Sequence, residues 1–249
     1  MIVKFDGFQR DELAECILSL KSSDDVIHIV NRSQSLDSRF WLSFLEGTGF
    51  LDLERRHLDA LSNLSPRDWW EISYDPNNDG TYAHSKTAQP FHTDNAWFAS
   101  PPELNFFIMS KQAVSGGMQL IYPVRRLLDD LESEDASLFN DLTTVEVEIK
   151  KGNEIEGNKT TIISLDEYNP KIYWNFYRVN KCTNEIENLC GRFFQYLGVK
   201  QNSSSVDRLD SQTGDSFCFN DTHILHARDS FVAGRKGDRV LLQSMWNYK

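Results

Sequence analysis

The sequence predicts a mainly β protein with flanking helices, of the β-sandwich or jelly-roll class. Helical patterns are concentrated in residues 1–70, whereas residues 71–249 hold many short apolar segments separated by turn residues. No internal repeat, low-complexity tract or clear boundary divides the chain. We therefore expect one domain over residues 1–249, with a helix-rich part at 1–70 and a jelly-roll core at 71–249 that carries a helical insert at 183–197.

The N-terminal part is expected to hold a strand–helix–strand unit and further helices. Asp11 can cap a helix whose apolar side includes Leu13 and Ile17. The β-branched segment Val26–Val30 favours a buried strand. Residues 37–46 are helical in pattern, and residues 51–70 carry leucines at helical spacing before a probable strand at 72–74.

The remaining elements are read from apolar runs and alternation. Residues 143–150 alternate between apolar and polar, which indicates a half-buried strand. Helices are expected at 124–138 and 183–197. The other expected strands lie at residues 104–110, 118–122, 160–165, 171–179, 215–219, 224–228 and 239–246.

Composition and charge narrow the class of protein. The 249 residues include 26 basic and 37 acidic ones, a net charge of −11, which argues against a nucleic-acid or anionic-membrane partner. The four cysteines show no CxxC spacing, so a zinc site is not expected. No signal-peptide pattern or bilayer-spanning stretch is evident, so we expect a cytoplasmic enzyme or binding protein that takes a small molecule. The oligomeric state is left open.

The stretch Gln89–Asn95 contains the first candidate metal ligands. His92 and Asp94 are two residues apart, so on an extended strand both side chains point to the same face. One imidazole and one carboxylate make two-thirds of a 2-His-1-carboxylate facial triad, which holds non-haem Fe(II) and leaves positions open for other ligands. A bare His-x-Asp is weak evidence, so the hypothesis needs a second histidine.

Two histidines compete for the third ligand position. His223 and His226 are three residues apart, an odd offset that places them on opposite faces of a strand, so only one can be a ligand. The pattern Leu225–Arg228 favours His226. Arg239 follows in an apolar strand, whereas its rival Arg235 lies in a Gly-Arg-Lys-Gly turn and is expected to be solvated.

Together these blocks resemble the taurine dioxygenase and γ-butyrobetaine hydroxylase-like branch of the Fe(II)/2-oxoglutarate oxygenases. The resemblance covers roughly residues 85–245 and is most specific in its distal block. The matching features are His92-Thr93-Asp94, Pro101-Pro102, Ser115-Gly116-Gly117, Gly214-Asp215, Leu225–Phe231 and Arg239. It implies a double-stranded β-helix, a cupin-like jelly roll.

The resemblance also implies residue roles and co-substrates. His92, Asp94 and His226 would ligate Fe(II), and Arg239 would anchor the C5 carboxylate of 2-oxoglutarate. An arginine suits that task because its planar guanidinium binds a carboxylate through two parallel hydrogen bonds. Oxygen would then oxidise a C–H bond with release of succinate and CO2.

Two positions qualify the resemblance. Family members commonly carry a threonine after the Gly-Gly turn, where this chain has Gln119, whose amide could still donate to a carboxylate of the co-substrate. Related halogenases have a small residue at the carboxylate position, so Asp94 favours hydroxylation, desaturation or a related oxidation.

Substrate contacts are the least constrained part of the sequence. Trp97 could line the pocket or belong to the core. Arg178 and Arg228 could bind a carboxylate-bearing substrate or form structural ion pairs. The loops 77–85 and 151–159 are candidate lids from composition.

The resulting prediction is hydroxylation of a small polar metabolite, such as an amino acid or its derivative. Two alternatives stay open. The first is an iron oxidase of the same fold that performs desaturation or cyclisation, or that does not use 2-oxoglutarate, as Gln119 suggests. The second is a non-enzymatic metal-binding jelly-roll module.

Overall fold

The computed structural model describes residues 1–31, 36–58, 63–152, 157–165 and 169–249. Its helices are α1 (Arg10–Ser19), α2 (Ser38–Glu46), α3 (Val124–Glu134), α4 (Ala136–Thr144) and α5 (Asn184–Lys200). Its strands are β1 (Ile2–Asp6), β2 (Val26–Val30), β3 (Leu51–Glu54), β4 (Trp70–Ser73), β5 (Gln89–His92), β6 (Leu104–Lys111), β7 (Gln119–Pro123), β8 (Glu146–Ile149), β9 (Asn158–Thr161), β10 (Ile163–Ser164), β11 (Lys171–Ile172), β12 (Asp207–Leu209), β13 (Ser216–Asn220), β14 (Ile224–Arg228) and β15 (Val240–Tyr248).

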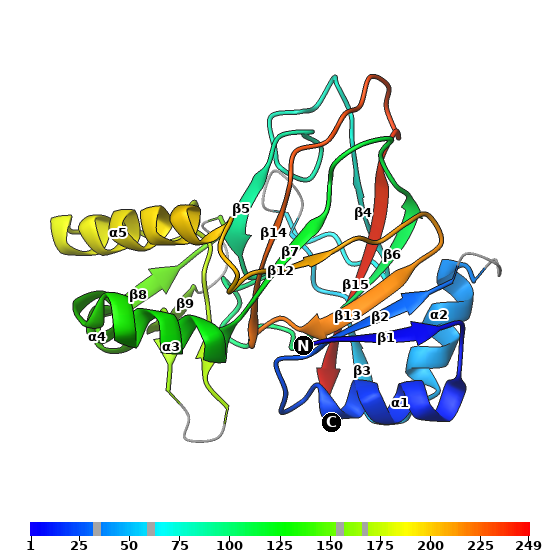
Figure 1. Ribbon diagram of the computed structural model, residues 1–249, viewed down its shortest axis with the longest axis horizontal. Coiled ribbons are helices and arrows are strands. Elements are labelled where there is room, and N and C mark those ends of the chain that lie inside the picture. The colour runs from blue at the N-terminus through cyan, green and yellow to red at the C-terminus, as the bar shows by residue number, and fades with distance from the viewer. Residues whose placement is uncertain (32–35, 59–62, 153–156, 166–168) are drawn as a thin grey trace.

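Two β-sheets form the centre of the molecule (Figure 1). The larger sheet runs β1-β2-β13-β6-β15-β3, with β4 also paired to β15, and the smaller one runs β12-β7-β14-β5. Apolar side chains from both sheets share one cluster, in which Phe107 and Phe217 of the larger sheet meet Ile121 and Ile224 of the smaller. This two-sheet arrangement confirms the predicted mainly β jelly-roll class.

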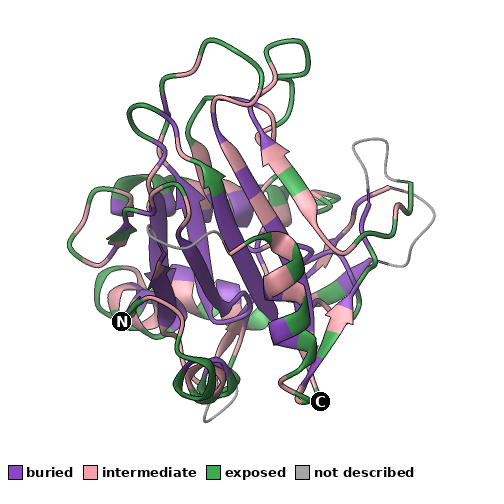
Figure 2. Cartoon of the chain, turned by 90° about the vertical axis from the view of Figure 1, so that its right-hand side faces the viewer, coloured by how far each residue is buried: buried purple, intermediate pink, exposed green. Residues whose placement is uncertain are grey.

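Side chains alternate between the two faces of each strand, so the position of a residue determines whether it faces the other sheet or the covering helices. In β14, Ile224 belongs to the cluster between the sheets, whereas Leu225 and Ala227 pack outward against the helices. The even-numbered residues of β14, including His226, therefore lie on the inner face. Figure 2 shows the central strands buried along most of their length.

Helices cover the outer faces of both sheets. On the larger sheet, Leu13 of α1 and Trp41 of α2 pack against Phe106 and Trp246. Asp37 accepts hydrogen bonds from the first backbone amides of α2, which confirms the predicted start of that helix. The helices α3, α4 and α5, which lie between β7 and β12 in the sequence, cover the outer face of the smaller sheet, at the left of Figure 1.

The N-terminal part contributes strands as well as helices. β1 and β2 extend the larger sheet through β13, so residues 1–30 are continuous with the jelly roll. The helical spacing of Leu58, Leu61 and Leu64 does not correspond to a helix in the described residues, because Leu58 and Leu64 form an isolated antiparallel bridge. Earlier in the same segment, Leu51–Glu54 forms β3 along the edge of β15. The hydrogen-bonded pairing with β15 stabilises Leu51–Glu54 as a strand, and this tertiary interaction outweighs the weak local preference for a helix. Part of that prediction, residues 59–62, lies outside the described residues.

Two further expectations need correction. The helix expected at 124–138 is two helices, because Asp135 leaves helical geometry (φ −148°) and accepts a hydrogen bond from Leu138 N to start α4. The strand expected at 171–179 ends at Ile172. The aromatic residues that follow serve packing instead: the Trp174 ring lies 4.8 Å from that of Phe193 on α5. No described helix has the length and apolarity to cross a membrane.

Candidate metal centre

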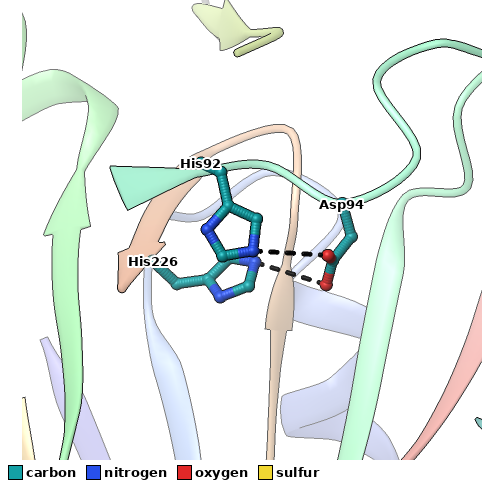
Figure 3. A group of neighbouring side chains, drawn as sticks. All are labelled: His92, Asp94 and His226. Atoms are coloured by element: carbon teal, nitrogen blue, oxygen red, sulfur yellow. Dashed lines mark ion pairs between the residues drawn. The ribbon is translucent and has the colours of Figure 1, made fainter. Parts of the chain in front are cut away.

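Two histidines and one aspartate converge between the sheets. β5 and β14 pair antiparallel with His92 directly opposite His226, and Asp94 follows two residues after the end of β5. The candidate ligand atoms of the three residues all lie within 4.8 Å of one another (Figure 3). His92 Nε2 is 3.5 Å from Asp94 Oδ1, and His226 Nε2 is 3.3 Å from Asp94 Oδ2.

The turn after β5 explains how Asp94 reaches the histidines. Asn95 adopts a left-handed conformation (φ 55°), which asparagine tolerates better than most residues and which turns the chain sharply. Asp94 N donates to Asp221 Oδ2 at 2.8 Å, and Thr93 N donates to the carbonyl of Trp174 at 2.7 Å. These two bonds attach the turn to β14's preceding loop and to the loop before α5.

The donor atoms fit a divalent metal ion. His92 Nδ1 lies 2.9 Å from the carbonyl of Pro90 and must donate to it, which leaves a lone pair on Nε2. The amide nitrogen of Gln89 lies 2.9 Å from that Nε2 and can only donate, so this hydrogen bond uses the lone pair that a metal ion would take and would give way on metal binding. Two imidazoles and a carboxylate with open space beside them are the donor set of a non-haem Fe(II) site.

Burial and mutual charge shift the pKa values of this cluster. Burial opposes the charge on Asp94, but His226 and His92 outweigh it and hold the pKa of Asp94 well below its ordinary value. Burial would likewise lower the pKa of His226, but the carboxylates of Asp94 and Asp221 raise it to about 10. Burial raises the pKa of Asp221 to about 7. The two carboxylates thus make the surroundings of His226 favourable to positive charge.

A cavity of about 630 Å³ opens onto the three residues. Of the residues singled out in the sequence, it is lined by His92, Asp94, His226, Gln119, Trp97, Arg178, Arg228 and Arg239. The lid candidate 77–85 contributes residues 79–85, and Lys151 lines the opposite wall. Residues 153–156 of the other lid candidate lie outside the described residues.

The two rival residues lie elsewhere. His223 is not a lining residue, and its Nδ1 is 3.0 Å from the carbonyl of Pro170. Arg235 lies in the exposed turn before β15, where its backbone amide binds Asp238. The structure thus brings His226 and Arg239 to the cavity and leaves His223 and Arg235 outside it.

Arg239 is a buried cation at the cavity wall. Only 1% of the residue is exposed, and burial together with the charge of Arg228 lowers the pKa of Arg239 to about 9. The guanidinium carbons of Arg228 and Arg239 lie 5.0 and 5.4 Å from the centre of the Phe231 ring. An anionic ligand here would be favoured by both charges in a low-dielectric setting.

Gly117 makes room for Arg239, which gives a testable prediction. Gly117 has φ 77°, and an added Cβ would lie 3.1 Å from Arg239 Nε. Gly117→Ala should therefore destabilise the fold by about 1–2 kcal/mol and displace the Arg239 guanidinium. If Arg239 anchors 2-oxoglutarate, as the resemblance implies, binding of the co-substrate should weaken roughly tenfold. Urea unfolding and co-substrate titration measure the two effects. Gly191→Ala is the control, because nothing lies within 4 Å of that helical position; equal co-substrate affinity in both variants would contradict the prediction.

The guanidinium of Arg228 binds backbone carbonyls of the neighbouring loop. Its Nη2 atom donates to the carbonyls of Tyr82, Ser85 and Thr87 at 3.2, 3.0 and 2.9 Å. These contacts support its structural interpretation, although the partners are backbone carbonyls rather than a carboxylate. Arg228 thereby fastens the loop that forms one wall of the cavity.

Arg178 and Trp97 remain suitable for substrate contact. No ion pair involves Arg178 among the residues that the structure describes, and burial lowers its pKa. The Trp97 side chain is largely buried, and the ammonium of Lys151 lies 4.8 Å from its ring centre. An aromatic surface and an available guanidinium therefore both face the cavity.

Several site residues were not identified from the sequence. Gln243 and Asn105 donate to Asp94 Oδ2, and Asp221 holds the backbone of Asp94. A signal existed for the first, because Gln243 follows Arg239 by four residues and so shares its strand face. A polar Asn105 within the apolar run of β6 was a weaker signal.

Comparisons with known proteins agree with this geometry. A family model described as taurine catabolism dioxygenase TauD, TfdA family, matches residues 32–246. A search of curated proteins finds no match.

Solved structures with the same fold include three non-haem iron oxygenases or their relatives. An asparagine oxygenase is 13% identical, with a TM-score of 0.72 over 95% of this chain and 78% of that one. PvcB from Pseudomonas aeruginosa is 12% identical, with a TM-score of 0.69 over 100% and 86%. OrfP, a non-haem iron oxygenase solved with Fe and α-ketoglutaric acid, is 13% identical, with a TM-score of 0.65 over 96% and 80%.

The family match spans most of the chain and includes all three residues of the candidate metal centre. The chain therefore belongs to the TauD/TfdA family, whose members are Fe(II)- and 2-oxoglutarate-dependent dioxygenases.

Proposed function

We propose that this protein hydroxylates an unactivated C–H bond of a small polar metabolite that carries a carboxylate, such as an amino acid or its derivative. The observation that carries the proposal is a single cavity in which the His92–Asp94–His226 cluster, the buried Arg239 and the available Arg178 all meet. That arrangement offers a metal site and two separate positive charges for two anionic ligands.

In this proposal His92, Asp94 and His226 hold Fe(II). Bound iron, with 2-oxoglutarate and O2, supplies the oxidising power, and succinate, CO2 and a hydroxylated product result. The protein's part is to bind, orient and exclude water. Arg239 would bind the remote carboxylate of 2-oxoglutarate, and Gln119, which is paired in register with Arg228 on the neighbouring strand, would contact the co-substrate beside it.

The substrate would lie between Arg178 and Trp97. A guanidinium there can bind the substrate carboxylate, and the indole can pack on its carbon skeleton. The related asparagine oxygenase was solved with a hydroxylated asparagine, and OrfP with hydroxylated arginines, which supports an amino-acid-like substrate. Asp94 occupies the carboxylate position of the triad, which favours hydroxylation over halogenation.

The decisive experiment is a metabolite panel with the protein, Fe(II), ascorbate and 2-oxoglutarate. Succinate release and the mass of the product are the readouts. A gain of one oxygen is the expected result, and a loss of two hydrogens would assign desaturation instead. Turnover of a panel member without 2-oxoglutarate, and without succinate release, would refute the proposed reaction.

Replacement of Arg178 tests the substrate end of the cavity. Arg178→Gln should raise the substrate KM at least tenfold, because a hydrogen bond to a charged group contributes about 1.5–3 kcal/mol. The KM for 2-oxoglutarate should stay unchanged, which makes it the internal control. An unchanged substrate KM would exclude Arg178 from the substrate contact.

A further inference from the structure

We propose that Gln243 and Asn105 are positioning residues that hold the Asp94 carboxylate in the orientation in which its two oxygens face His92 and His226. The inference rests on the proposed metal site and adds a role for two residues outside the candidate ligand set. Both belong to the larger sheet, Gln243 on β15 and Asn105 on β6, whereas Asp94 follows β5 of the smaller sheet.

The contacts converge on a single carboxylate oxygen. Gln243 Nε2 donates to Asp94 Oδ2 at 2.7 Å, and Asn105 Nδ2 donates to the same oxygen at 3.2 Å. The other oxygen, Oδ1, is the one that lies 3.5 Å from His92 Nε2. Oδ2, the oxygen that both amides bind, also lies 3.3 Å from His226 Nε2, so the amides determine which carboxylate oxygen faces which histidine.

The orientation of both amides is determined by the contacts themselves. A carboxylate can only accept, so each amide must present its NH2 group to Asp94. Gln243 Nε2 also donates to Asn105 Oδ1 at 3.1 Å, which identifies Oδ1 as the acceptor and leaves Nδ2 of Asn105 to donate to Asp94. Asn105 and Gln243 are 1% and 6% exposed, so these hydrogen bonds form in a largely buried setting, where they are stronger than in water.

Orientation is the property that this arrangement controls. A facial triad requires the carboxylate and both imidazoles to converge on one point and to leave an open face beside it. Two charge-assisted hydrogen bonds to Oδ2 restrict the rotation of the Asp94 carboxylate about its Cβ–Cγ bond. Because the donors stand on the opposite sheet, they also fix the direction from which the carboxylate faces the histidines.

The test is Fe(II) binding to Gln243→Met, a substitution of similar length that removes the donor. The dissociation constant is measured anaerobically by competition with a chelator, and the visible charge-transfer absorption is recorded after 2-oxoglutarate is added. We expect Fe(II) binding about 10- to 100-fold weaker, the range for lost outer-shell partners, and a shifted absorption band. Gln212→Met is the matched control, because its amide also binds an aspartate, Asp210 at 2.6 Å, on the exposed surface.

The outcomes separate this inference from the proposed function. If the unaltered protein binds no Fe(II), the proposed metal site is wrong and the inference falls with it. If the unaltered protein binds Fe(II) and Gln243→Met matches it within twofold with the same absorption band, the positioning role alone is refuted. Should Gln243→Met fail to fold, Gln243→Asn decides the matter, since it keeps a polar side chain but withdraws the donor by one methylene.

Discussion

Replacement of His226 by alanine is expected to abolish stoichiometric Fe(II) binding, and turnover with it. His226 lies at the middle of β14 opposite His92, so the strand pairing places it without any loop movement. Loss of a ligand should exceed the roughly 10- to 100-fold loss that follows removal of an outer-shell partner. Iron content after anaerobic reconstitution, together with succinate release, measures the effect.

His223→Gln is the control for that experiment. His223 is buried three residues earlier, and its ring binds the carbonyl of Pro170 outside the cavity. We expect this variant to lose some stability and to keep its iron. Full iron occupancy in His226→Ala, or loss of iron from a folded His223→Gln, would reverse the assignment between the two histidines.

Arg239→Gln is expected to weaken 2-oxoglutarate binding by roughly 100- to 1000-fold. Removal of one partner of a buried ion pair costs about 3–5 kcal/mol, and each 1.4 kcal/mol is about a factor of ten. Arg239 Nη2 donates to the carbonyl of Gly117 and its guanidinium lies 5.4 Å from the centre of the Phe231 ring, so Fe(II) binding to the variant serves as the internal control. Titration of the Fe(II) protein with 2-oxoglutarate gives the dissociation constant.

Arg235→Gln provides the comparison for Arg239. Arg235 is exposed in the turn before β15 and does not line the cavity. Its replacement should leave the affinity for 2-oxoglutarate within about twofold, as is typical of surface substitutions. An effect at Arg235 equal to that at Arg239 would show that the anchor had been assigned to the wrong arginine.

Strands with a strong local pattern were predicted well. The bounds of β2 and β14 agree with the expectation, because both are short apolar runs ended by polar or turn residues. The predictions failed where tertiary packing rather than the local pattern decided the conformation of a segment. Residues 51–54 became a strand only because β15, almost 200 residues later, offers them an edge. Residues 173–179 contribute aromatic side chains to a cluster with α5 instead of continuing β11.

The same distinction between local pattern and tertiary packing applies to the residues of the candidate site. The residue types and their spacing in the sequence indicated His92, Asp94, His226 and Arg239. Ligand chemistry restricts which residue types can bind a metal ion or a carboxylate, and strand periodicity predicts which side chains share a face. The role of Arg228 could not be predicted in this way. Three backbone carbonyls of the loop 82–87 bind its guanidinium, and no sequence pattern reveals such backbone partners.

The sequence alone thus predicted the family resemblance, the mainly β class and the three candidate metal ligands. Each of these depends on local periodicity or on the chemistry of a few side chains. The residues that support Asp94 were not predicted. Gln243 and Asp221 are 149 and 127 residues away from Asp94 in the chain. Asn105 is only 11 residues away but stands on the other sheet, so its hydrogen bond forms only when the two sheets have packed. Hydrogen bonds of this kind depend on distances of a few ångström between segments, which spacing along one chain does not encode.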